Sequence, residues 1–488
     1  MINPIFPILA GVSLVLAGCS NNDDDNTGGA PSVLTCSGTA AQTERLFLQQ
    51  LGSDSVIVKW RPSSDAGTEV SSVCFGTDMA ALPADSKSAA TITATGHQEV
   101  LLSGLQPDTL YYYSVGAAGV ADAAHQFRTA PAAGQLPSDG NVRIVIIGDS
   151  GVAGTGKPEA GYVRDGFMTF LKNNGDEPAD LFLMLGDNAY DQGTDVEHQL
   201  AIFDVYPALL ASTSLWPTIG NHEMGTLGIS MSSDSSTYAI VGDGKIDPPP
   251  AGPMPYLNIF SLPAGGEIGG LASGTEQYYS FDYGNLHVVS LDSQLSIRDS
   301  DSRAVMLQWL KDDLQANNLD WTIVIFHHPP YTKGSHDSDR ELGGIDLPIF
   351  LIREEFTPVF EQYGVDLAYS GHSHIYERSK YINGNVGLSE AFNNATMAEL
   401  TPAGEVSSGQ GDEAYTQITR SGVDDKVVYT VAGNGGKITS TSEGYPHPAH
   451  FFSELALGSV VIDVDDKRLE ASFVGVNGEV LDSFVMTR

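Results

Sequence analysis

The hydrophobic pattern divides the chain into two regions. Between residues 32 and 131, apolar and β-branched residues come in short runs separated by turn-forming residues, with no helical period. The clearest runs are 46–48, 55–60, 72–75 and 110–115. Short strands with frequent turns are typical of β-sandwiches, so this region predicts an all-β domain of about 100 residues.

From residue 142 onward, buried strands alternate with amphipathic helices. Residues 142–147 form a near-continuous apolar run, which predicts a strand buried on both faces. Further strands are predicted at 181–185, 216–219, 321–326 and 366–369, and helices at 162–171, 196–210, 304–314 and 350–363. Residues 142–488 therefore predict an α/β domain whose sheets are covered by helices. Residues 132–141 are small and polar and predict a linker, while 224–254 and 383–425 predict long loops.

The N-terminus has the features of an export signal. The apolar run 5–16 is too short to span a bilayer, and it ends in Leu16-Ala17-Gly18-Cys19, which resembles a bacterial lipobox. Residues 1–19 would then be a lipoprotein signal peptide, Cys19 would be lipidated, and residues 20–31 would be a flexible tether. We expect an exported protein of the cell envelope, favouring the outer membrane, whose only membrane contact is its lipid. Because no Lys or Arg precedes the apolar run, an ordinary cleaved signal peptide and secretion remain the alternative.

Two cysteines remain beyond Cys19. In an exported protein, Cys36 and Cys74 predict a disulfide, with two buried free thiols as the alternative.

Net charge narrows the range of partners. The chain has 24 Lys and Arg against 61 Asp and Glu, for a net charge of −37. A surface this acidic repels the phosphates of nucleic acids, so nucleic-acid binding is not expected. An acidic protein that acts on an anionic substrate needs local positive charge, and metal ions are the natural source where basic side chains are scarce.

Five short motifs directly follow predicted strands. They are Gly148-Asp149-Ser150-Gly151, Gly186-Asp187-Asn188-Ala189-Tyr190, Gly220-Asn221-His222-Glu223, His327-His328-Pro329-Pro330 and Gly371-His372-Ser373-His374. Ligand sites of α/β folds gather at the carboxyl ends of strands, and a glycine before the key residue allows a sharp turn into the site. Each motif is weak when taken alone. Alternate histidines on an extended segment face the same way, so the His-x-His motif is the strongest indication of a metal site.

In this order, the five motifs resemble those of the calcineurin-like metallophosphoesterases, and most closely the purple acid phosphatases. The resemblance extends over residues 142–488, and the flanking segments 278–282, 290–292 and 376–378 agree with it. The region before it is similar to the N-terminal domain of plant-type members, and residues 105–113 resemble the corner of a fibronectin type III domain. The implied fold is a sandwich of two mixed β-sheets flanked by helices, preceded by an all-β fibronectin III-like sandwich.

The resemblance also implies a function and assigns residues to it. Two metal ions would activate a hydroxide that hydrolyses phosphomonoesters, as in an acid phosphatase. The first ion, expected to be Fe(III), would be bound by Asp149, Tyr190 and His374. The second ion, expected to be divalent zinc, manganese or iron, would be bound by Asn221, His327 and His372. Asp187 would bridge both ions, and His222 and His336 would contact the phosphate, where either could protonate the leaving group.

Three alternatives remain open from the sequence. Gly148-Asp149-Ser150 also resembles the nucleophile motif of the GDSL esterases, but the C-terminal region has no Asp-x-x-His pair. A second alternative is a non-catalytic surface protein, and a third keeps the metals but acts on phosphodiesters or nucleotides. For individual residues, His222 could instead only orient Asn221, and His336, like His447 and His450, could be a surface residue.

Overall fold

The computed structural model describes residues 43–62, 72–82, 85–88, 90–92, 96–116, 124–175, 178–224, 254–340, 346–417 and 425–488. The predicted signal peptide, Cys19, the tether and Cys36 lie outside these ranges, so their predictions stay predictions. Cys74 is buried and disulfide-bonded. No helix in the described ranges has the length and apolar character needed to cross a membrane.

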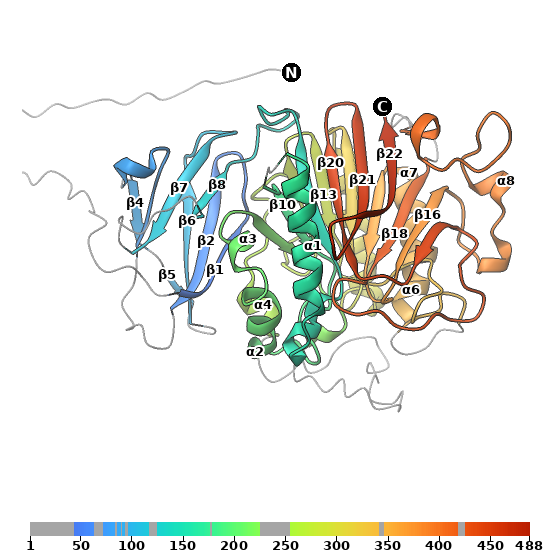
Figure 1. The fold of residues 1–488 in the computed structure, drawn as a ribbon, viewed down its shortest axis with the longest axis horizontal. Helices are drawn as coiled ribbons and strands as arrows, with labels where there is room; N and C mark the ends of the chain where they lie inside the picture. The colour runs from blue at the N-terminus through green and yellow to red at the C-terminus, as the bar shows by residue number, and fades with distance from the viewer. Residues whose placement is uncertain are drawn as a thin grey trace, which may run out of the picture. The chain divides into compact units, whose positions relative to one another are not determined.

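The described strands form three sheets (Figure 1). The largest has the order β17 (Tyr415–Thr416), β22 (Val480–Thr487), β21 (Arg468–Gly475), β20 (Gly458–Val464), β9 (Val142–Ile147), β10 (Leu181–Met184), β11 (Ser214–Pro217), β1 (Thr43–Gln49), β2 (Ser55–Pro62), β6 (His97–Ser103), β5 (Ala90–Ile92). The second has the order β12 (Tyr279–Tyr283), β13 (Leu286–Ser290), β14 (Trp321–Ile325), β15 (Leu367–Ser370), β18 (Val427–Ala432), β16 (Tyr376–Ile382), β19 (His450–Glu454). The third has the order β4 (Asp85–Ser88), β3 (Ser72–Gly76), β7 (Leu110–Val115), β8 (Gln126–Arg128).

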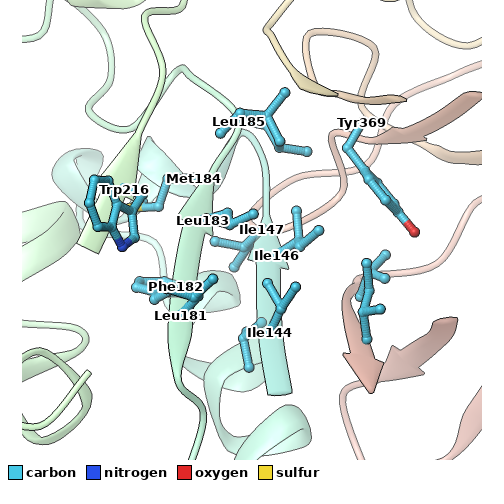
Figure 2. Packing of buried hydrophobic residues seen from close by; sticks show 14 of the residues in the cluster. Ile144, Ile146, Ile147, Leu181, Phe182, Leu183, Met184, Leu185, Trp216 and Tyr369 are labelled. Carbon is cyan, nitrogen blue, oxygen red and sulfur yellow. The ribbon is translucent and has the colours of Figure 1, made fainter. Parts of the chain in front are cut away.

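The two larger sheets share one apolar core. Every residue of β9 and β10 is buried, as expected for strands covered on both faces (Figure 2). Trp216 of the first sheet stacks on Phe281 of the second, with ring centroids 3.7 Å apart. On the outer faces, α1 (Glu159–Asn173) packs against β20 and β21, and α5 (Ser300–Ala316) buries Met306 and Leu310 in a second apolar cluster. The predicted two-sheet sandwich with flanking helices is therefore confirmed.

The remaining helical segments are short. They are η1 (Met79–Ala81), η3 (Ser150–Thr155), α2 (Asp195–His198), η4 (Gln199–Phe203), α3 (Pro207–Leu210), η5 (His222–Met224), α4 (Pro255–Ile259), α6 (Leu347–Leu351), η7 (Ile352–Phe356), α7 (Thr357–Gln362), η8 (Ser389–Ala391), α8 (Asn394–Met397) and η9 (Gly411–Glu413).

Two predictions made from the sequence need correction. The helix predicted at 196–210 is α2, the π-helical turn η4 and α3, because Pro207 lacks the N–H that would continue the helix. The loop predicted at 383–425 contains η8, α8, η9 and β17.

Parallel pairing places the five motifs at facing strand ends. Strands β9, β10 and β11 run parallel, and so do β13, β14, β15 and β18. Asp149, Asp187 and Asn221 follow strands of the first sheet, whereas His327 and His372 follow strands of the second. The carboxyl ends of both sheets therefore bring these residues to one place.

Candidate metal centre

The loops that carry the site residues have unusual backbone geometry. Asp149, Asp187 and His372 have φ angles of 55°, 52° and 66°, in the left-handed region. Non-glycine residues rarely adopt this conformation, and those that do cluster at functional sites, where the surrounding structure maintains it. The glycine before His372 also leaves room for the Asp149 carboxylate, since a Cβ on Gly371 would lie 2.4 Å from Asp149 Oδ2.

One group of side chains surrounds the Tyr190 hydroxyl. This oxygen lies 3.0 Å from Asp149 Oδ1, 2.9 Å from Asp187 Oδ2 and 3.2 Å from His374 Nε2. His374 Nε2 also lies 3.4 Å from Asp149 Oδ1. A phenol has one proton and can donate it to one of the two carboxylates only. The hydroxyl can therefore serve only one carboxylate oxygen at a time, whereas a cation here would attract both.

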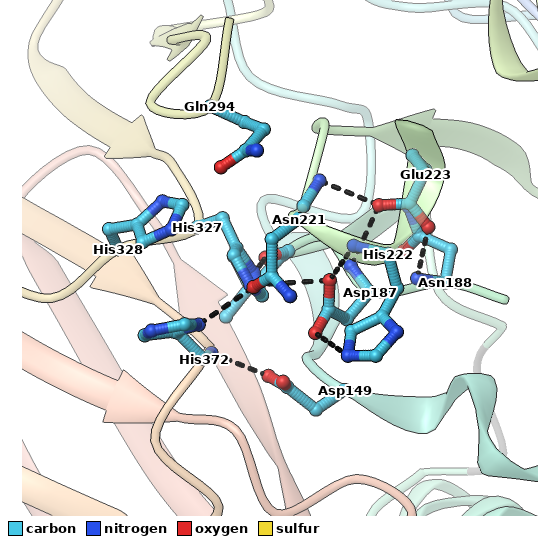
Figure 3. A network of polar contacts seen from close by, with 12 residues as sticks. Asp149, Asp187, Asn188, Asn221, His222, Glu223, Gln294, His327, His328 and His372 are labelled. Carbon is cyan, nitrogen blue, oxygen red and sulfur yellow. Dashed lines mark hydrogen bonds and ion pairs between the residues drawn. The ribbon is translucent and has the colours of Figure 1, made fainter. Parts of the chain in front are cut away.

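A second group meets at the side-chain oxygen of Asn221 (Figure 3). His327 Nε2 lies 3.0 Å from Asn221 Oδ1, and His372 Nδ1 lies 2.9 Å from it. His327 Nδ1 faces the Leu185 carbonyl at 2.8 Å and must donate a proton to it, which leaves the lone pair of a neutral His327 on Nε2. His327 Nε2 also lies 3.3 Å from Asp187 Oδ1, so Asp187 contacts both groups. An amide oxygen, a carboxylate and imidazole nitrogens that converge in this way are the donor set of a transition-metal ion.

The pKa shifts at the site show that its carboxylates favour positive charge beside them. Burial disfavours a charged His327, but the Asp187 carboxylate outweighs it and raises the pKa of His327 to about 9. Burial would raise the pKa of Asp187, yet His327 and His222 hold it well below its usual range. Burial and both carboxylates raise the pKa of the Tyr190 phenol well above its usual value, a shift that a bound cation would reverse. The residues present therefore fit a pair of metal ions.

The two histidines predicted to contact substrate lie at this site. His222 donates its backbone N–H to Asp187 Oδ1 at 2.8 Å, and its Nδ1 lies 2.6 Å from the Asp191 carbonyl. His336 stacks on His372 with ring centroids 3.7 Å apart, and about a quarter of its side chain is exposed. Neither is an isolated surface residue. The surface interpretation of His447 and His450 is wrong, because both are buried.

Two regions of the chain match known protein families. Residues 142–376 match the calcineurin-like phosphoesterase family, and residues 43–129 match the purple acid phosphatase N-terminal domain. The chain joins a purple acid phosphatase N-terminal domain to a calcineurin-like phosphoesterase domain.

Individual relatives cover part of the chain. Purple acid phosphatase 23 of Arabidopsis thaliana is 27% identical over 299 residues, which cover 58% of this chain and 57% of that protein. Purple acid phosphatase 15 of the same plant is 26% identical over 311 residues, 58% of this chain and 49% of that protein. The chain thus spans about half the length of these curated relatives. The structure of purple acid phosphatase PPD1 from yellow lupin seeds has the same fold, with a TM-score of 0.62, 17% identity and coverage of 92% of this chain and 75% of that one.

Two acidic residues that support the candidate metal site were not assigned a role from the sequence. Glu223 is fully buried and accepts backbone N–H bonds from Asp187 at 2.9 Å, Asn188 at 2.6 Å and Gly220 at 2.6 Å, so it ties two site loops together. Glu223 is the last residue of the Gly220–Glu223 motif, so the sequence could have indicated that it belongs to the site. Asp346 contacts His336 and His372, but no local pattern around it indicates a site residue. His328, next to the predicted ligand His327, is buried, and its Nδ1 lies 2.9 Å from Ser293 Oγ.

Proposed function

We propose that the chain is a phosphomonoesterase that works with two metal ions bound by seven residues, which are Asp187 and the six ligands around it. The observation that carries the proposal is the convergence of carboxylate, phenol, amide and imidazole atoms from five strand ends on one place. Phosphodiesters or nucleotides are the alternative substrates on the same fold. Phosphomonoesters are favoured as substrates because these relatives are named purple acid phosphatases.

The two donor groups differ in chemical character, which supports two different ions. Asp149, Tyr190 and His374 offer a carboxylate, a phenol and one imidazole, which would suit Fe(III). The second group would bind a divalent zinc, manganese or iron ion and consists of Asn221, His327 and His372. Asp187 contacts members of both groups and would be shared between the ions.

Two such ions would neutralise phosphate oxygens and lower the pKa of a bound water, so that hydroxide is available near neutral pH. The chain's own residues would orient the ester and move protons. His222 has Nδ1 committed to the Asp191 carbonyl, which leaves Nε2 to meet a phosphate oxygen. His336 has Nδ1 committed to Asp346, so its Nε2 would donate a proton to the leaving oxygen.

The serine-esterase alternative fits this site poorly. Ser150 would have to expose its hydroxyl to a substrate, yet the residue is fully buried, with no exposed surface. A Ser150→Ala variant should therefore keep its activity, whereas an esterase would lose it.

The test combines metal analysis, a visible spectrum and a panel of phosphomonoesters and phosphodiesters. We expect iron plus one divalent ion per chain, cleavage of monoesters, and loss of activity on chelation. Tyr190→Phe should remove the tyrosinate-to-iron absorption band, whereas Tyr162→Phe, which changes a tyrosine that is 53% exposed, should leave it unchanged. A protein that binds no metal after reconstitution, or that stays active after chelation, would exclude the proposal.

A further inference from the structure

Asp346 contacts two site histidines through a single oxygen. This residue directly precedes α6, and its Oδ1 lies 2.8 Å from His336 Nδ1 and 3.2 Å from His372 Nε2. The two imidazole rings lie nearly parallel, 26° apart, so both present a nitrogen to the same carboxylate. About 15% of the Asp346 side chain is exposed.

We propose that Asp346 is a positioning residue that fixes the proton of both histidines on the nitrogen facing away from the reaction. The inference rests on the proposed function, because His372 would be a metal ligand and His336 the proton donor. It adds a residue that neither the sequence motifs nor the family matches assign to the site.

The consequence for His372 follows from its two ring nitrogens. A carboxylate oxygen can only accept, so Nε2 must carry the proton that it donates to Asp346. A neutral imidazole then has its lone pair on Nδ1, the atom that faces Asn221 Oδ1 at 2.9 Å. That lone pair is the one a metal between His372 and Asn221 would use. Carboxylates that hold the remote N–H of a metal-bound histidine set its orientation and raise its basicity.

The same oxygen has a different effect on His336. Because Nδ1 donates to Asp346, Nε2 is the ring nitrogen left to face the substrate. Stacking on His372 at 3.7 Å keeps the ring in this plane. One carboxylate thus couples the orientation of the proton donor to that of a metal ligand.

Helix capping does not explain the position of the carboxylate. Asp346 occupies the N-cap position of α6, yet its side chain accepts no hydrogen bond from the helix. A further metal ion bound by His336, Asp346 and His372 would be a competing explanation, since their ligating atoms lie within 4.8 Å of one another. The distances of 2.8 and 3.2 Å are those of ordinary hydrogen bonds, which favour the positioning role.

The variant Asp346→Ala separates these explanations, and Asp346→Glu is its conservative counterpart. The control is Glu354→Ala, which removes the same charge from an exposed position of η7. We expect Asp346→Ala to weaken binding of the divalent ion about 10–100-fold while iron and its absorption band remain, because only His372 depends on Asp346. Asp346→Glu should restore part of this affinity, and Glu354→Ala should match the wild type. In metal-free protein, nitrogen NMR of the imidazoles should show His372 protonated at Nε2 in the wild type and a tautomer mixture in Asp346→Ala.

Three outcomes would overturn the inference: unchanged affinity for the divalent ion in Asp346→Ala, a His372 tautomer that does not change, or a third ion in the wild type that this variant loses. Failure of the proposed function looks different. In that case the wild type itself would bind no metal or cleave no phosphate ester, whatever the state of residue 346.

Discussion

At the scale of single residues, Gly220 shows how closely one site loop approaches another. A Cβ at this position would lie 2.2 Å from Asp187 N and 2.3 Å from Asp187 Oδ1. Gly220→Ala must therefore displace the carboxylate that both ions would share. We expect kcat/KM to fall about 100-fold, the usual cost of a displacement near 1 Å in an active site.

The control is Gly161→Ala on α1, because the nearest neighbour of a Cβ at this position is a side-chain atom 4.0 Å away. Equal activity of the two variants would contradict the crowding argument.

His287 gives a residue-scale prediction for pH. It is buried, with Nδ1 2.7 Å from Asp282 Oδ1 and Nε2 2.9 Å from Asp313 Oδ2. Burial lowers its pKa, but the hydrogen bonds to both carboxylates outweigh this and raise it to about 9. Because the folded pKa lies above the unfolded value of about 6.5, the stabilisation is complete below pH 6.5 and is lost as pH rises towards 9.

We expect this effect to lower the free energy of unfolding by about 3 kcal/mol between pH 6.5 and 9. Urea unfolding of metal-free protein across this range, with His287→Gln for comparison, measures it. The difference between wild type and variant isolates His287, since all other titrating groups are common to both. A difference that stays constant with pH would show that His287 is not charged in the folded state.

The seven predicted ligands were identifiable because each follows a strand within a short motif. Asp149 and Asp187, for example, each come after a glycine at the end of an apolar run. Asp346 had no such signal: it precedes a short helix, and its contacts to His336 and His372 are made across the fold. A residue such as Asp346, which supports predicted site residues, is brought to them by tertiary contacts. A pattern along the chain gives no information about such contacts.

At the scale of elements, the π-helical turn η7 supports the loop at 330–338 that carries His336. Arg353 of η7 is buried, and its Nη1 donates to the carbonyls of Ser338 at 2.6 Å and Pro330 at 3.3 Å. One side chain thus holds both ends of this loop. The periodic pattern predicted a helix at 350–363 but not the π-helical turn, because a pattern of apolar residues does not reveal i→i+5 hydrogen bonding.

Arg353→Met should therefore disturb the loop without removing a ligand. We expect the free energy of unfolding to fall by about 1–3 kcal/mol, since two carbonyls lose their charged donor. Activity should fall while both metal ions stay bound, because His327 precedes the loop and Asp346 remains. Elemental analysis together with kcat distinguishes this outcome from that of Asp346→Ala.

The control is Arg303→Met, which removes a partly buried arginine of α5 that contacts Glu355 and the Ile297 carbonyl. Loss of the divalent ion from Arg353→Met would contradict a role limited to the loop.

At the scale of the whole molecule, the N-terminal strands continue the largest sheet of the phosphoesterase domain. β1 pairs in parallel with β11 at Leu48 and Ser214, and Phe47 belongs to the apolar core shared by the larger sheets. Lys59, almost fully buried, donates to Ser261 Oγ at 2.7 Å. The sequence predicted the β-rich region and a linker after it. It did not reveal that the sheet continues, because pairing between β1 and β11 joins residues about 165 positions apart, and a local pattern has no information on this scale.

This continuity predicts that changes in the N-terminal domain destabilise the phosphoesterase domain. Tyr113 of β7 is fully buried and donates its hydroxyl to the Ala211 carbonyl at 2.7 Å, just after α3 and before β11. Tyr113→Phe leaves that buried carbonyl without this donor, so we expect a loss of about 1–3 kcal/mol in the free energy of unfolding. Because β11 lies next to β10, whose end carries Asp187, amides of both strands should exchange faster with solvent in the variant. Tyr112→Phe, on the same strand but only partly buried, is the matched control. Faster exchange confined to the strands of the N-terminal domain would show that the two regions unfold separately.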